Sequence, residues 1–172
     1  MYTTKYYSPN TPIVHLAHGY IPDKNNSLSW KEFDYGEESF FGTKADGGIY
    51  TTAKEMIYWI DALRDNKIIS ELTKTTMWTP TTRVYGSTLC DYQNRPNTYY
   101  GLGWFIAQQQ NLPLKVYHTG DNGGFQAYEG YFPDADVAVI ILENRNDKPR
   151  WELVEQIDSI LNEAGVLKPI EK

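Results

Sequence analysis

The stretch Val116-Tyr-His-Thr-Gly-Asp-Asn-Gly-Gly-Phe125 decides the fold prediction for this chain. Its first residues favour a β-strand, and its glycines allow the backbone to turn tightly or to approach a ligand closely. After it, Phe125–Phe132 alternates large and small residues, and residues 133–136 have the composition of a turn. Val137–Leu142 is a continuous apolar run, which is typical of a strand covered on both faces. Together these segments predict consecutive antiparallel strands.

Two helices are predicted earlier in the chain. A Thr-Thr pair at positions 51–52, followed by Glu55, is a candidate capping box. In such a box a hydroxyl caps the first turn and the carboxylate reaches back to it. Apolar residues then recur at helical spacing, so we expect a helix over residues 53–64. Ser70 is expected to cap a second, shorter helix over residues 71–78.

The other segments are assigned from their composition and periodicity. Residues 1–48 are predicted to form loops with one short strand at Ile13–Leu16, and Thr81–Tyr99 is predicted to be a long loop. Tyr100–Gln108 is expected to be one strand. An amphipathic C-terminal helix is expected to cover one face of the sheet. Its apolar positions are Trp151, Val154, Ile157, Ile160 and Leu161.

The composition argues against several classes of function. The 172 residues fit one ordinary domain, and a net charge of −6 without a Lys/Arg run makes nucleic acid an unexpected partner. No apolar run approaches the roughly 20 residues that cross a bilayer. Cys90 is the only cysteine, so no internal disulfide is expected. His15 and His18 lack ligands at metal-binding spacing, so neither a metal nor a cofactor is predicted. Glu129 and Asp134 lack a partner acid for a two-carboxylate hydrolase.

Several segments, taken in order, resemble one family of enzymes. They are Ala45-Asp-Gly-Gly-Ile-Tyr-Thr-Thr-Ala53, Tyr100-Gly-Leu-Gly-Trp104, His118-Thr-Gly120, Gly123-Gly-Phe125, Tyr131-Phe-Pro133 and Val139-Ile-Ile-Leu-Glu-Asn144. This set is similar to the third active-site motif and its surroundings in serine β-lactamases and penicillin-binding-protein-like hydrolases. The class C and esterase-like branch is the most similar. The resemblance covers roughly residues 42–163 and corresponds to the C-terminal portion of the family.

The resemblance implies an α+β fold, part of the β-lactamase/transpeptidase fold. We expect an antiparallel sheet of three to four strands, the C-terminal helix on one face, and two helices from a helical subdomain. Residues 1–99 would then be the remnant of the helical and loop subdomain. Residues 100–172 would form the sheet and the C-terminal helix.

The resemblance also implies roles for individual residues. The backbone N–H of Asp121 matches the strand-side donor to the oxyanion, and Thr119 would hydrogen-bond the substrate's carboxylate or carbonyl. His118 stands, before Thr119 and Gly120, where class C enzymes carry lysine. A largely neutral imidazole fits the esterase or peptidase branches better than a dedicated β-lactamase. Substrate-binding positions are expected at Gly123, Gly124 and Phe125.

The family's nucleophile motif, Ser-x-x-Lys, does not occur anywhere in the 172 residues. Tyr92-Gln-Asn94 fits a second family motif by letter, but it follows the Gly-Gly-Ile-Tyr segment instead of preceding it. We therefore expect the chain to be inactive by itself, with the nucleophile in preceding polypeptide. Its parent would hydrolyse an ester, amide, D-amino-acid peptide or β-lactam. The alternative is a non-catalytic module that binds peptidoglycan or glycans, suggested by 14 Tyr and 5 Trp residues.

Two expectations concern partners and location. In the resembled fold the strand matching Val137–Leu142 pairs with a strand that this chain lacks, and an open apolar edge favours association. We expect a homodimer through this edge, or its cover by Met1–Tyr7. The first residues of the sequence are polar and aromatic and contain no secretion signal. The sequence alone therefore predicts no cellular compartment. The resemblance implies a periplasmic or extracytoplasmic parent.

Overall fold

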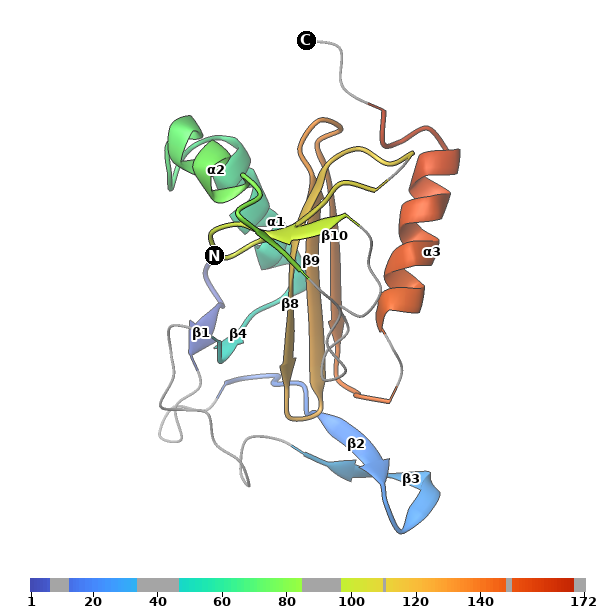
Figure 1. The fold of residues 1–172 in the computed structure, drawn as a ribbon. Helices are drawn as coiled ribbons and strands as arrows, with labels where there is room; N and C mark the ends of the chain where they lie inside the picture. The colour runs from blue at the N-terminus through green and yellow to red at the C-terminus, as the bar shows by residue number, and fades with distance from the viewer. Residues whose placement is uncertain (7–12, 34–46, 85–96, 110, 148–149, 169–172) are drawn as a thin grey trace. The chain divides into compact units, whose positions relative to one another are not determined.

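The computed structural model describes residues 1–6, 13–33, 47–84, 97–109, 111–147 and 150–168 (Figure 1). Cys90 and Tyr92–Asn94 therefore lie outside the described residues. The strands are β1 (Lys5–Tyr6), β2 (Tyr20–Asp23), β3 (Asn26–Glu32), β4 (Ile49–Tyr50), β5 (Thr82–Arg83), β6 (Thr98–Tyr100), β7 (Phe105–Ala107), β8 (Lys115–Asn122), β9 (Phe125–Phe132) and β10 (Val137–Glu143). The helices are α1 (Ala53–Arg64), α2 (Glu71–Met77) and α3 (Arg150–Glu163).

The main sheet has six strands in the order β10-β9-β8-β7-β6-β5. The predicted α+β class and the consecutive strands from 116 to 142 are confirmed. The sheet is wider than the three to four strands expected. One reason is that both ends of the predicted loop Thr81–Tyr99 form strands, with Thr82 opposite Tyr100.

The single strand predicted over Tyr100–Gln108 is wrong, because Tyr100 ends β6 and Phe105 begins β7. Two glycines make the turn between them. A Cβ on Gly101 would lie 2.1 Å from the carbonyl oxygen of Met77, and Gly103 has a φ of +77°. Only glycine fits the first position, and the second has a backbone conformation that favours glycine.

Residues 1–48 contain more regular structure than expected. Ile13–Leu16 is not a strand, whereas β2 and β3 form a hairpin inside the segment predicted as loops. The side chain of Asp23 stabilises the turn of this hairpin by accepting a hydrogen bond of 2.8 Å from the N–H of Asn25. Composition pointed to a loop because turn residues and polar residues dominate this stretch.

The described residues form two compact units, each built from separate stretches of the chain. One contains residues 1–58, 119–128 and 140–148, and the other contains residues 59–118, 129–139 and 149–172. The division at residue 99 that the resemblance implies groups residues differently, and it stays a prediction.

The second unit has packed side chains on both faces of its strands. Ile60 and Leu63 of α1 share one core with Val116, and neighbouring Tyr117 places its ring 5.5 Å from that of Trp151 in α3. Because successive strand residues point to opposite faces, α1 and α3 lie on opposite sides of these strands. Trp104, Ile106 and Tyr131 complete the α1 core.

Helix α3 covers a face of the strands as predicted, but two of its positions differ from the expected pattern. Ile160, expected to be buried, is 64% exposed, whereas Asp158 is only 3% exposed. The buried carboxylate of Asp158 pairs with Lys115 of β8. A search for apolar periodicity misses such a position, because it scores an acidic residue as solvent-facing.

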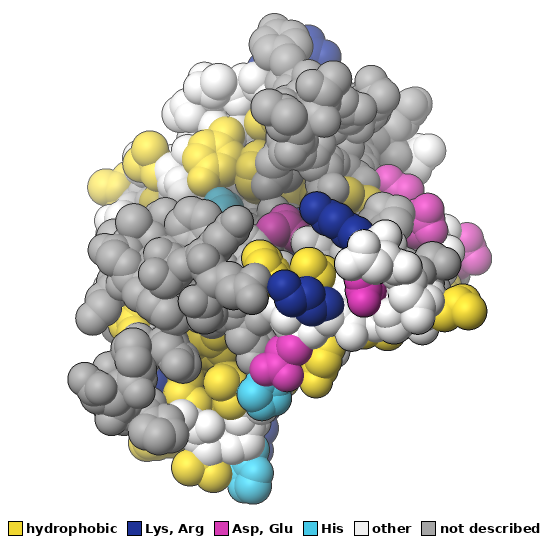
Figure 2. Space-filling view, turned by 90° about the horizontal axis from the view of Figure 1, so that it is seen from below, with side chains coloured by type: hydrophobic (Ala, Val, Ile, Leu, Met, Phe, Trp, Pro, Cys, Tyr) yellow, Lys and Arg dark blue, Asp and Glu magenta, His cyan; other side chains and the backbone are white. Residues whose placement is uncertain are grey.

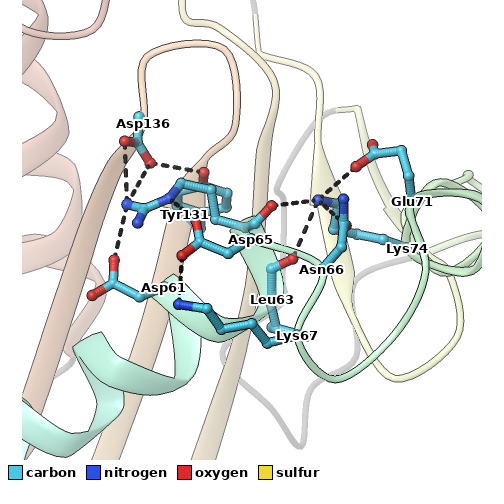
Figure 3. A network of polar contacts seen from close by, with 10 residues as sticks. Asp61, Leu63, Asp65, Asn66, Lys67, Glu71, Lys74, Tyr131 and Asp136 are labelled. Carbon is cyan, nitrogen blue, oxygen red and sulfur yellow. Dashed lines mark hydrogen bonds and ion pairs between the residues drawn. The ribbon is translucent and has the colours of Figure 1, made fainter.

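A polar network joins the end of α1 to α2 and β9 (Figure 3). The buried Lys74 ammonium donates to the carbonyl oxygens of Leu63 and Arg64 at 3.2 and 3.1 Å, and so caps the C-terminus of α1. Arg64 lies 3.4 Å from Asp136, which accepts a hydrogen bond of 3.0 Å from the Tyr131 hydroxyl. Burial raises the pKa of the Tyr131 phenol, and the hydrogen bond to Asp136 raises it further.

In the first unit, the N-terminal residues bind the start of α1. Thr52 accepts a hydrogen bond of 3.2 Å from the N–H of Glu55, as the predicted cap requires. The expectation that the Glu55 carboxylate reaches back to this cap is wrong. It accepts instead from the N–H groups of Tyr2 and Thr3 and from the Thr4 hydroxyl. These donors belong to the residues that directly precede β1.

The edge strand β10 has one neighbour, β9, in the part of the chain that the structure describes. The expected cover by Met1–Tyr7 is wrong for Lys5–Tyr6, because these residues pair with Ile49–Tyr50 of β4. Beyond the end of β10, Tyr20 donates to Asn144 and accepts from Asn146, at 3.0 and 3.1 Å.

Charges of opposite sign lie close together in the first unit. His18 Nδ1 is 3.0 Å from a Glu32 oxygen, and Arg145 pairs with Asp147 while stacking over the Trp30 ring at 4.5 Å. On the face drawn in Figure 2, basic side chains near the middle lie beside acidic ones. Among the described residues, no helix is long and apolar enough to cross a membrane.

Candidate functional site

The predicted site residues lie where β8 continues beyond its pairing with β7. This pairing covers Lys115 to Tyr117, and the last matched pair is Phe105 with Tyr117. Strand β8 then runs on to Asn122. His118 and Thr119 are half-buried, and Gly120 and Asp121 are exposed. The structure therefore places the four residues together on a partly accessible length of strand.

The His118 ring is held by aromatic neighbours from β6 and β7. The Tyr100 hydroxyl forms a hydrogen bond of 3.1 Å with His118 Nε2. The ring of Phe105 lies 5.4 Å from the imidazole and 4.6 Å from the ring of Tyr100. Sequence reasoning quoted Tyr100 as part of a motif but gave it no role. Nothing in its spacing from His118 could have identified the contact.

Gly123 and Gly124 lie at the tip of the β8–β9 hairpin, where the backbone packs closely. A Cβ on Gly124 would lie 2.1 Å from the amide nitrogen of Tyr20, and Gly123 has a φ of +57°. The N–H of Gly124 donates to the carbonyl oxygen of Phe33 at 2.9 Å. These contacts give both glycines a structural role, whereas their assignment to substrate binding stays a prediction.

Phe125 packs against this same junction. Its ring lies 6.0 Å from that of Tyr50, edge to face, and it would contact any side chain placed on Gly19. The assignment of Phe125 to substrate binding also stays a prediction.

Glu129 of β9 is a titratable group that sequence reasoning set aside. Its carboxyl is largely buried, and this burial raises its pKa to about 7. Its Oε1 atom is buried without a hydrogen-bond partner among the described residues. Buried polar atoms nearly always have partners, so this carboxyl needs an explanation.

No other part of the described chain offers a clearer site. The described residues contain no group of three His, Cys, Asp or Glu side chains placed to hold a metal ion. A shallow hollow of about 290 Å³ lies between the link before β8 and helix α3. Its lining includes Gln109, Asn111, Glu155 and Asn162, and none of the predicted site residues.

Comparison with known proteins identifies the family of the chain. The family model described as Beta-lactamase matches residues 1–160. No curated protein sequence is similar enough to count as a match.

Solved structures share the fold. A penicillin-binding protein from Bacillus halodurans superposes with a TM-score of 0.70 at 22% identity, over 93% of this chain and 44% of that one. An octameric penicillin-binding protein homologue from Pyrococcus abyssi gives 0.73 at 22% identity, over 96% and 34%. A β-lactamase/D-alanine carboxypeptidase from Yersinia pestis, complexed with citrate, gives 0.53 at 22% identity, over 71% and 36%.

The chain thus spans less than half the length of each of these proteins. At 22% identity the superpositions establish the fold, and the family model adds the sequence evidence. The chain belongs to the β-lactamase family, whose model covers residues 1–160.

Proposed function

We propose that this chain supplies the strand-side wall of an acyl-transfer site. The parent protein would hydrolyse an ester, amide, D-amino-acid peptide or β-lactam through an acyl-serine intermediate. The observation that carries the proposal is the extension of β8 beyond β7, from His118 to Asn122. Gly120 and Asp121 are exposed on this length of strand, and an extended peptide can bind alongside a strand through backbone hydrogen bonds.

The chemistry assigns a role to each residue of this wall. Acyl transfer needs donors that stabilise the developing oxyanion, and in this proposal the N–H of Asp121 is one of them. The Thr119 hydroxyl receives the substrate's carboxylate or carbonyl. His118 is fixed by Tyr100, so its ring is oriented before a ligand arrives. Gly123, Gly124 and Phe125 support the far end of the hairpin.

We also propose that the chain by itself forms no acyl-enzyme. A serine needs an adjacent base to become nucleophilic, and the Ser-x-x-Lys pair that provides both in this family is absent from the sequence. The parent is proposed to act outside the cytoplasm, where the peptidoglycan-like substrates of such a site would be found.

The wall can be tested directly by NMR on the 172-residue chain. A peptide ending in D-alanine with a free carboxylate should shift the amide signals of Thr119, Gly120 and Asp121. The matched control is the same peptide with an amidated C-terminus, which should shift them much less, because the hydrogen bonds to a charged group are lost. Equal shifts with both peptides, or shifts confined to other strands, would contradict the proposal.

The absence of acylation needs its own experiment. The chain is incubated with a fluorophosphonate and with a labelled penicillin, and its intact mass is measured. The unmodified mass is expected in both cases. A stoichiometric adduct on any serine would show that the chain carries its own nucleophile and would overturn this part of the proposal.

Among the described residues, only part of the aromatic content that suggests the glycan-binding alternative is accessible. Trp104, Tyr117, Tyr128, Tyr131 and Trp151 are buried in the core, whereas Tyr2, Tyr6, Trp30 and Tyr58 are exposed. Titration of muropeptides against tryptophan fluorescence tests this alternative. A saturable response in the presence of an unreactive D-alanine peptide would favour it.

A further inference from the structure

The buried carboxyl of Glu129 has an identifiable neighbour across the sheet. Strands β8 and β9 are joined by only two residues, Gly123 and Gly124, so Asn122 lies opposite Phe125. Counting back along both strands places His118 opposite Glu129. Directly opposite residues have Cβ atoms about 5 Å apart on the same face of a sheet.

Three contacts on the two strands support this register. They join Lys115 with Phe132, Val116 with Tyr131, and Gly120 with Ala127. The Lys115 ammonium lies 5.5 Å from the Phe132 ring centre, and a Cβ on Gly120 would lie 4.0 Å from that of Ala127. Val116 and Tyr131 belong to one core cluster. The pairs lie on both sides of His118 and Glu129, so no slip in the register separates them.

Among the described residues, the other groups near this pair give the buried Oε1 atom of Glu129 no hydrogen-bond partner. On the same face of β9, the next titratable side chain is Tyr131, whose hydroxyl donates to Asp136 beside Arg64. Helix α1 contributes Ile60 and Leu63 to the core on this face. Strand β10 contributes Ala138, which packs against the same core and is also apolar. A carboxylate among such groups is strongly disfavoured unless a cation is close by.

The His118 ring can carry this cation without losing its existing hydrogen bond. The Tyr100 hydroxyl lies 3.1 Å from Nε2. A hydroxyl donates to a bare ring nitrogen and accepts from a protonated one, so the bond persists in both states. The contact with Tyr100 is therefore compatible with both the neutral and the protonated ring.

We propose that Glu129 is a positioning residue for His118, and that the two side chains share a single proton across the neutral pH range. In one state the proton is on Glu129 and both groups are neutral. In the other, the carboxyl O–H bond is broken, an imidazole N–H bond is formed, and the pair is ionic. No proton is gained or lost between the two states.

The ionic state gives β8 a cation where the resembled enzymes carry lysine. A substrate carboxylate arriving at Thr119 would stabilise this state, so the pair favours acyl substrates that bear a carboxylate. This use of the pair rests on the proposed function. The pairing itself is a property of the chain and exists without a substrate.

An NMR pH titration of the His118 ring in the 172-residue chain tests the pairing. Removing the carboxylate in Glu129→Gln should lower the His118 midpoint by about half a pH unit or more, because the imidazolium loses its nearby anion. Glu129→Leu should give the same shift, and it keeps the position filled by an apolar side chain of similar size. The matched control is Glu152→Gln, a change at an exposed position of α3, which should leave the midpoint unchanged.

The reciprocal measurement uses the Glu129 carboxyl itself. In His118→Ala the carboxyl midpoint, followed by its ¹³C signal, should rise above the wild-type value, because the nearby cation is gone. An unchanged His118 midpoint in both folded Glu129 variants would overturn the proposal. So would an unchanged Glu129 midpoint in His118→Ala.

These results separate the pairing from the proposed function. If His118 responds to Glu129 while the D-alanine peptide fails to shift the β8 amides, the pairing stands and the acyl-site proposal fails. If the peptide binds but His118 titrates independently of Glu129, the acyl-site proposal stands and the pairing fails.

Discussion

Lys115 of β8 and Asp158 of α3 form an ion pair in which each residue is only 3% exposed. The Lys115 ammonium also lies 5.5 Å from the centre of the Phe132 ring. Two opposite charges have thus been removed from water together at the contact between helix and sheet. The arrangement makes each partner strongly dependent on the other, because an isolated buried charge is far more costly than the pair.

Asp158→Ala should therefore destabilise the fold by about 3–5 kcal/mol, since it leaves a buried ammonium without its counter-ion. Urea denaturation followed by far-UV circular dichroism measures the loss. The double variant Lys115→Met/Asp158→Leu should recover most of it, because well-packed apolar side chains often replace a buried pair without loss. The control Glu152→Ala, at an exposed position of the same helix, should change stability by less than about 0.5 kcal/mol. A loss below about 1 kcal/mol in Asp158→Ala would contradict the buried pair.

The stability of the chain should fall in acid through Glu55. The hydrogen bond from Thr4, together with those from the N–H groups of Thr3 and Tyr2, lowers the pKa of this carboxyl to about 2. Since the folded pKa lies below its ordinary value of 4.5, the stabilisation is present above pH 4.5 and is lost as the pH falls towards 2. Thermal midpoints measured from pH 5 to pH 2.5 should fall less steeply in Glu55→Gln than in the wild type. Parallel curves would show that Glu55 binds the N-terminal residues weakly in solution.

Gly124→Ala should disrupt the junction at the hairpin tip. The added methyl group would meet the Tyr20 amide nitrogen at 2.1 Å, so backbone must move, and overpacking of this kind costs about 1–3 kcal/mol or more. Chemical denaturation should show this loss, and NMR should show shifted amide signals for Gly19 and Tyr20. Gly47→Ala is the matched control, because a Cβ there has no atom within 4 Å. Similar losses in the two variants would mean that the close approach at Gly124 does not limit stability.

We propose that the chain dimerises through β10, whose outer edge is available in the described part of the sheet. Sedimentation velocity over a range of concentrations should show a dimer. A charge on an edge strand opposes edge-to-edge pairing, so Leu142→Lys should shift the equilibrium towards the monomer. Leu153→Lys on α3 is a closely matched control, since the two leucines are 42% and 41% exposed. A wild-type monomer at high concentration, or equal effects of the two lysines, would contradict the proposal.

Local sequence signals predicted the helices and strands whose conformation is determined by residues close together in the sequence. Helix α1 occupies the predicted residues 53–64, because the cap at Thr52 and the apolar spacing agree. The strands from 116 to 142 were also predicted, because glycines and a Pro-Asp turn punctuate apolar segments. The hairpin of β2 and β3 was missed, since its polar residues favour turns and only pairing makes them strands.

The candidate site, like the fold, could be predicted from the sequence only in part. The order of short motifs singled out His118, Thr119, Gly120 and Asp121, which belong to β8, and their role in a site stays a prediction. Tyr100 could not be assigned, because its contact with His118 depends on how β6, β7 and β8 are aligned. Glu129 was set aside for lack of a partner acid, although its burial and its place opposite His118 are what distinguish it.

Strand β8 pairs with β7 only as far as Tyr117, and this divides β8 into two parts under different selection. Side chains up to Tyr117 are enclosed by α1, α3 and β7, so natural variation there should be conservative in volume. Side chains from His118 onward are freer to diverge among relatives as their ligands diverge. Among relatives, substitutions in the first part of β8 should correlate with the thermal stability of the protein. Substitutions from His118 onward should correlate with ligand specificity.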